Sequence, residues 1–134
     1  MSFQKIRSIK VSERVFDLVC EELDLCATEY NKKIWGYLQT FNNCREQGYY
    51  LTISSIADFN DKQRTKEDMY VWACECRNSD EIMIVISYKH PRINGMFDEE
   101  AYENRRFFGY DELQPSADFI INQVKKHFAY EMGK

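Results

Sequence analysis

Apolar residues recur every three to four positions along the first third of the chain. This spacing puts them on one face of an α-helix and continues for about eight turns. Ser12 is the predicted N-cap, with Val11 and Phe16 placed to form a hydrophobic staple, and Gly48 is the predicted C-terminal stop. The pattern therefore predicts a long helix over 12–47, and Gly36 leaves open whether it is one helix or two. The stripe consists of Phe16, Val19, Leu23, Cys26, Ala27, Tyr30, Ile34, Tyr37, Leu38, Phe41 and Cys44.

The period then changes to two, which is the spacing of a β-strand. Strands are predicted over 49–57, 69–77 and 81–89, with a charged loop over 58–68 and a short hairpin link over 77–80. Pro91 ends the third strand because proline has no N–H for a ladder. Three further elements are predicted: an exposed helical turn over 98–104, a short fourth strand over 105–110, and a closing helix opened by Pro115 and Ser116.

The order of these elements predicts a single α+β domain over residues 1–134. It has a long N-terminal helix, a three- to four-stranded antiparallel meander and a C-terminal helix. Both faces of the predicted strands carry apolar residues, so each face needs at least partial cover. A second, thinner stripe of Leu18, Leu25 and Trp35 suggests that the long helix contacts another surface, which would allow a homodimer through this helix.

Charge and composition restrict the class of protein. The formal net charge is -4 and the basic residues are scattered, which argues against direct binding of nucleic acid. The first residues include no apolar core of a signal peptide, and no window reaches the ~18 apolar residues of a membrane span. Five cysteines without a secretion signal indicate reduced thiols and a cytoplasmic protein.

The stretch around Cys74 could carry chemistry, but its spacing does not favour it. Cys74-x-Cys76 is not the C-x2-4-C knuckle of a zinc site, although His90 could join the two thiols in space. Asp68 with Glu75-x-Arg77 faintly resembles the acid and E-x-K pattern of metal-dependent nucleases, in which arginine is a poor substitute for the lysine. We therefore assign no catalytic, cofactor-binding or metal-binding residue, and we expect that the protein is not an enzyme and needs no cofactor.

Aromatic residues make up 15% of the chain, and they are dense between residues 97 and 110. Acidic residues lie among them, so this stretch could combine aromatic anchors with a charged rim, as protein interfaces often do. The alternative is that the rings close one end of the core. The predicted partner-binding residues are Phe97, Asp98, Glu99, Glu100, Tyr102, Glu103, Phe107, Phe108 and Tyr110.

Three functions are compatible with the sequence. The favoured one is a small acidic cytosolic module that binds a protein partner and acts by occupying its surface. In size and order of elements the chain resembles secretion chaperones, immunity proteins and phage or mobile-element inhibitors of host defence, and this resemblance implies an inhibitor or chaperone role but no particular residues. The second is a small-molecule pocket lined by Tyr50, Trp72 and Tyr88. The third is a metal-dependent enzyme.

Overall fold

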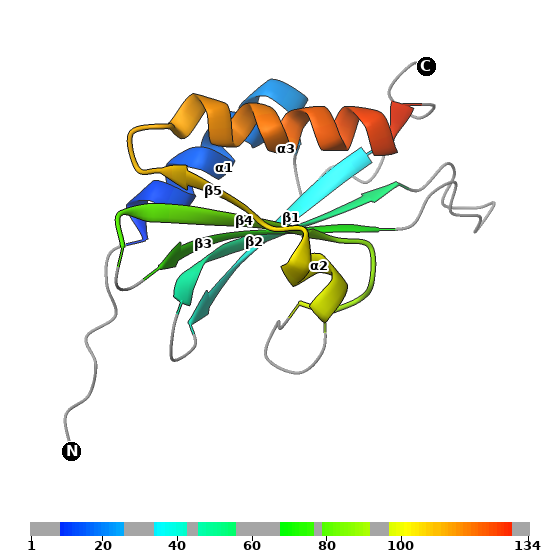
Figure 1. Ribbon diagram of the computed structural model, residues 1–134. Helices are drawn as coiled ribbons and strands as arrows, with labels where there is room; N and C mark the ends of the chain where they lie inside the picture. The colour runs from blue at the N-terminus through cyan, green and yellow to red at the C-terminus, as the bar shows by residue number, and fades with distance from the viewer. Residues whose placement is uncertain are drawn as a thin grey trace.

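A computed structural model describes residues 9–25, 34–42, 46–55, 68–76, 79–91 and 97–129 of the chain. Their backbone forms three helices and five strands (Figure 1). In chain order the elements are α1 (Lys10–Leu23), β1 (Ile34–Asn42), β2 (Glu46–Ser55), β3 (Met69–Cys76), β4 (Glu81–Ser87), α2 (Glu99–Glu103), β5 (Arg106–Gly109) and α3 (Leu113–His127).

The five strands form one antiparallel sheet in the order β1-β2-β3-β4-β5, so each strand pairs with its neighbours in the chain. Helices α1 and α3 lie together on one face of this sheet, and the short helix α2 lies against the other face (Figure 1). The predicted α+β fold with an antiparallel meander is confirmed. The meander has five strands rather than three or four, because one more strand precedes those predicted.

The predicted long helix over 12–47 is wrong beyond its first third. Helix α1 ends at Leu23, where Asp24 adopts the left-handed conformation that closes a helix. Residues 34–42 form strand β1 instead, and Gly48 lies within β2. Gly36 marks no helix kink: it lies on β1, where an added Cβ atom would be 3.1 Å from the side chains of both Leu25 and Leu51.

Two conclusions drawn from that helix change with it. The second stripe does not lie on one helix, since Leu18 belongs to α1, Leu25 follows α1 and Trp35 belongs to β1. A homodimer through a long helix therefore loses its structural basis. Ser12 is also not the N-cap, because the helix begins earlier and Ile9 occupies that position.

The later predictions agree with the structure to within a few residues. The strands predicted over 49–57, 69–77, 81–89 and 105–110 correspond to β2, β3, β4 and β5. The predicted exposed turn is α2, and the closing helix is α3, which begins two residues before Pro115. The loop predicted over 58–68 lies outside the described residues, except for Asp68. The first two residues of the link predicted over 77–80 also lie outside them.

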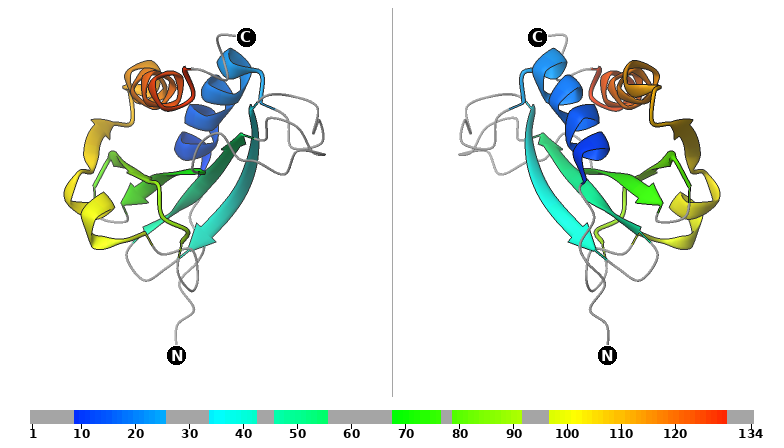
Figure 2. Two further views of the ribbon diagram at one scale, coloured as in Figure 1. Left: turned by 90° about the vertical axis from the view of Figure 1, so that its right-hand side faces the viewer. Right: turned by 90° about the vertical axis from the view of Figure 1, so that its left-hand side faces the viewer.

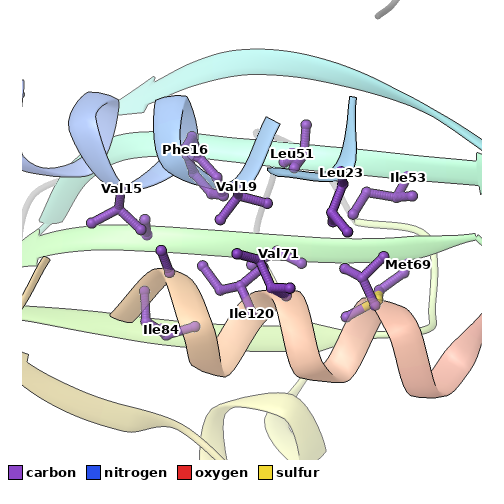
Figure 3. Packing of buried hydrophobic residues seen from close by; sticks show 14 of the residues in the cluster. Val15, Phe16, Val19, Leu23, Leu51, Ile53, Met69, Val71, Ile84 and Ile120 are labelled. Atoms are coloured by element: carbon purple, nitrogen blue, oxygen red, sulfur yellow. The ribbon is translucent and has the colours of Figure 1, made fainter. Parts of the chain in front are cut away.

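The main core lies between the sheet and the helices α1 and α3. Figure 3 shows Val15 and Val19 of α1 and Ile120 of α3 gathered with the sheet residues Val71 and Ile84. All five side chains are almost completely buried. Burial of this apolar area is the main force that holds the two helices to the sheet.

A second, smaller cluster covers the opposite face of the sheet. It contains Tyr70, Trp72, Cys74, Met83 and Val85 from β3 and β4, together with Ala101 from α2. The expectation that both faces of these strands need cover is therefore confirmed. Because α2 belongs to the stretch predicted to bind a partner, this cluster also fixes the position of that stretch.

Candidate partner-binding surface

Ring contacts attach the chain around α2 to the outer face of the sheet, meaning the face away from α1 and α3. The ring of Phe97 meets the ring of Trp72 edge-on, with 5.3 Å between centroids, and stacks on Tyr102 at 5.5 Å. Trp72 is fully buried and stacks on Tyr50 of β2 at 5.6 Å. Phe97 thus anchors the Tyr102 ring to the outer face of the sheet.

Tyr102 and Phe107 remain exposed on either side of an arginine. Their side chains are 40% and 48% exposed. The guanidinium carbon of Arg105 lies 4.1 Å from the Tyr102 ring centroid and 5.5 Å from that of Phe107, and Arg105 Nη1 donates to the Tyr102 carbonyl oxygen at 2.9 Å. We name Tyr102, Arg105 and Phe107 the aromatic clamp. Its rings and its cation lie within cation–π range, so they support each other's orientation.

Two other predicted contact residues, Phe108 and Tyr110, point away from the clamp and toward the main core. Phe108 and Tyr110 are half-buried and pack against the main core. The Phe108 ring lies 6.0 Å from the ring of Phe119 on α3, and the Arg106 guanidinium lies 4.8 Å from the same Phe119 ring. Strand β5 therefore divides the predicted set, because successive strand residues point to opposite faces.

The acidic residues of the predicted set also divide into a half-buried residue and exposed ones. Asp98 is half-buried, and its Oδ1 accepts a hydrogen bond from Ser87 Oγ at 3.0 Å. Lys89 Nζ lies 3.6 Å from Asp98 Oδ2 and 3.5 Å from Glu100 Oε2. Glu99 and Glu103 are exposed on α2. Asp98 thus helps to hold α2 to β4, while the glutamates form the solvent-facing rim.

A pocket of about 530 Å³ opens beside α2, at the end of β4. The pairing of β5 with β4 ends where Arg106 lies opposite Ile84. The end of β4 beyond Ile84 therefore has no β5 residue opposite it, and its Ile86 and Ser87 line the pocket. The floor and walls combine apolar and polar side chains from three elements and their flanks. The lining residues are Ile86, Ser87, Tyr88, Lys89, Asp98, Glu100, Ala101, Asn104, Phe119 and Gln123.

Of the three residues predicted to line a small-molecule pocket, Tyr88 lines this one. Its side chain is 41% exposed, its ring lies 4.6 Å from the ring of His127, and partial burial raises the pKa of its hydroxyl. Tyr50 and Trp72 are in the second core cluster instead, where the Tyr50 hydroxyl donates to Gln39 Oε1. The sequence could not separate them, because Tyr50 and Trp72 lie on strands, Tyr88 directly follows β4, and the cover of each is set by other elements.

The cysteines of β3 are packed into the second cluster. Cys74 is completely buried, and burial raises the pKa of its thiol well above the usual value, with Glu46 adding to the effect. Cys76 faces the same side, and burial raises its thiol pKa as well. A raised pKa keeps the thiol protonated and therefore a weak nucleophile.

The other candidates for chemistry do not converge with these thiols. Glu75 points to the opposite face of β3, where it bonds to Ser12 of α1. His90 is exposed beyond β4 with its ring 5.7 Å from that of Tyr70, and Arg77 lies outside the described residues. Within the ranges that the structure describes, no three His, Cys, Asp or Glu side chains form a group that could hold a metal ion.

None of the described helices is long and apolar enough to cross a membrane. Comparison of the chain with protein-family models, with curated proteins and with solved structures found no match.

Proposed function

We propose that this protein is a binding module that recognises a protein partner through the aromatic clamp and acts by occupying the partner's surface. The observation that carries the proposal is the exposure of Tyr102 and Phe107 around the guanidinium of Arg105. Tyrosine and arginine are enriched at the energetic centres of protein interfaces, and phenylalanine adds apolar area. The clamp presents all three on a rigid support.

The support matters because ordering flexible side chains during binding costs free energy. Phe97 fixes Tyr102 from below by stacking, and Phe108 and Tyr110 fix the strand that carries Phe107. A surface that is already ordered loses less conformational entropy on binding. In this proposal Phe97, Asp98, Phe108 and Tyr110 position the contact surface, and the exposed members of the set touch the partner.

The charges around the clamp suggest the kind of partner. Glu99, Glu100 and Glu103 lie on α2 beside the clamp, and the chain as a whole has a net charge of -4. An acidic rim steers a basic surface toward the contact and disfavours acidic partners. We therefore propose a basic protein surface as the target, in a cytoplasmic setting that suits free thiols, and a role of inhibitor, immunity or chaperone type.

Affinity capture with matched variants tests the proposal. The full-length chain is immobilised as wild type, as Phe107→Ala and as Tyr102→Ala, and proteins retained from a native extract are quantified by mass spectrometry. We expect a basic protein that the wild type retains and that both clamp variants lose. Tyr88→Ala is the control, because Tyr88 is as exposed as Tyr102 but lies in the pocket. Retention that survives both clamp changes contradicts the proposal.

The pocket supports a second candidate function, the binding of a small molecule. Its volume falls within the range of about 300–1,000 Å³ that is usual for ligand sites, and the apolar side chains of Ile86, Ala101 and Phe119 lie beside the polar groups of Ser87 and Asp98. A ligand that binds only the folded protein raises its melting temperature. A thermal-shift screen with metabolites tests this candidate, and a true ligand should lose its effect when Gln123→Trp fills the pocket.

A further inference from the structure

The two edges of the sheet are built differently. β5 is four residues long, begins with Arg106 and ends at Gly109, so it is short and charged. β1 is nine residues long, and Ile34–Asn42 contains no charged residue and no proline. Proteins usually protect a sheet edge with charges, prolines or short strands, because open N–H and C=O groups invite another strand. β5 has this protection and β1 does not.

No described strand pairs with the outer edge of β1, which stands at the rim of the curved sheet (Figure 2). Two adjacent side chains of this strand, Tyr37 and Leu38, are 47% and 36% exposed, although they point to opposite faces. On the helix face, Ile34 and Gly36 are buried, with Leu25 beside Gly36, whereas Leu38 is 36% exposed. Each face of β1 therefore presents one exposed large side chain near the middle of the strand, while Phe41 further along packs against the second core cluster.

We propose that β1 pairs antiparallel with β1 of a second copy of this chain, so that the two sheets become continuous across a two-fold axis. The symmetric register that uses the whole strand centres on Leu38. It sets Leu38 opposite the same residue of the second copy, Tyr37 opposite Gln39, and Trp35 opposite Phe41. Directly opposed residues share a face, so the two exposed leucines cover each other on the helix side.

The occupant is a second copy rather than a charged foreign strand because β1 is complementary to itself. Every cross-strand pair in this register is neutral, so no like charges meet across the axis. The strand combines a leucine pair, two aromatic pairs and two tyrosine–glutamine pairs. Gln39 Nε2 already lies 3.5 Å from the Tyr37 hydroxyl within one chain, which shows that these groups have matching reach. A self-complementary patch of this kind is the usual basis of a two-fold dimer.

Sedimentation equilibrium of the full-length chain tests the proposal, and we expect the wild type to behave as a dimer. Leu38→Lys sets two lysines opposite each other and removes the leucine pair, so the dissociation constant should rise at least about tenfold. Phe107→Lys is the matched control: it puts the same charge on an exposed residue of the other edge strand and should leave the dimer unchanged. A monomeric wild type, or a dimer that Leu38→Lys does not weaken, overturns the proposal.

A cross-linking experiment tests the register and does not depend on lysine being tolerated. Directly opposite residues of an antiparallel pair have Cα atoms about 4.5–5.5 Å apart, which a disulfide can span. Leu38→Cys should therefore give an oxidised dimer beyond the wild-type background, and oxidation carried out in denaturant should not give this increase. Phe107→Cys should give no increase. Cross-linking only at Phe107→Cys, or assemblies larger than a dimer, would contradict pairing through β1.

Loss of the dimer with retained partner capture leaves the clamp proposal intact, so the two proposals can fail independently.

Discussion

The carboxylate of Glu75 on β3 lies at the N-terminus of α1, where its Oε2 accepts a hydrogen bond from Ser12 N at 3.1 Å. The Ser12 hydroxyl lies 2.8 Å from the same oxygen and 3.0 Å from the Ile9 carbonyl oxygen. Both Glu75 and Ser12 are buried, and the N-cap residue Ile9 offers no side-chain acceptor. A carboxylate from a distant strand therefore satisfies the first turn of the helix, and its charge suits the positive end of the helix dipole.

Removal of this contact should destabilise the fold. We expect Glu75→Ala to lower the free energy of unfolding by about 2 kcal/mol, because the buried N–H of Ser12 loses its charged acceptor. Glu75→Gln retains an acceptor oxygen and should cost about 1 kcal/mol. Urea denaturation measures both values. Glu81→Ala, an exposed glutamate of β4, is the control and should change the free energy by less than about 0.5 kcal/mol. Equal effects of the three changes would contradict the capping role of Glu75.

Gly48 should tolerate no side chain, because a Cβ atom at this position would lie 2.1 Å from the Ala73 carbonyl oxygen. The backbone of Gly48 also has a φ of 158°, which other residues rarely adopt. We expect Gly48→Ala to lower the free energy of unfolding by about 2–3 kcal/mol, since the two strands must move apart. Gly109→Ala meets only the side chains of Asp111 and Glu112 and should cost much less. Similar melting temperatures for the two variants would show that β2 and β3 do not approach so closely.

The stability of the protein should fall in alkaline solution, in part because of Cys20. Burial, assisted by the charge of Asp17, raises the pKa of this thiol from 9.0 to about 11 in the folded state. Between these values the unfolded chain releases the proton and the folded chain keeps it, so stability is full below pH 9 and is lost as the pH rises toward 11. The side chain is half-buried, so we expect a loss of up to about 1 kcal/mol per pH unit.

Comparison of wild type with Cys20→Ala isolates this contribution. Urea denaturation at pH 8, 9 and 10 in the presence of a reductant should show a shallower decline for the variant. The tyrosines whose hydroxyl pKa is raised by burial, including Tyr49 and Tyr50, are present in both proteins and cancel in the difference. Parallel pH profiles would mean that Cys20 is ionised as easily in the folded state as in the unfolded state.

The residues of the predicted contact set should separate by their effect on stability. Phe107→Ala removes an exposed ring and should change the free energy of unfolding by less than about 0.5 kcal/mol. Tyr110→Ala and Phe108→Ala remove rings packed on the main core and should each cost about 1–3 kcal/mol. Thermal and urea denaturation measure these values. If Phe107→Ala unfolds the domain, the clamp is part of the core and the proposed contact surface is misplaced.

The hydrophobic pattern by itself determined four of the five described strands, the helical state of α1 and the closing helix α3. β3 and β4 could be predicted because their alternation is accompanied by β-branched and aromatic residues, and α3 because its apolar spacing is helical throughout. Apolar residues on both faces of these strands also predicted that the outer face needs cover, which α2 supplies. These features follow from local preferences, which a single sequence carries.

Only the tertiary structure decided the state of residues 34–42. Ile34, Tyr37, Leu38 and Phe41 fit a helical stripe, but the same four residues suit an edge strand with apolar groups on both faces. The hydrogen bonds that β1 makes with β2 select the strand, and no local pattern encodes that pairing. The same reason applies to α1, whose start depends on Glu75, sixty-three positions further along the chain.

The candidate surface was likewise only half determined by sequence. The density of rings and acids between residues 97 and 110 located the surface, because composition is a local property. Which of Phe107 and Phe108 faces solvent depended on α3 covering one face of β5, and burial of Tyr110 depended on the main core. Alternation along a strand assigns residues to two faces, but only packing against other elements decides which face is left to water.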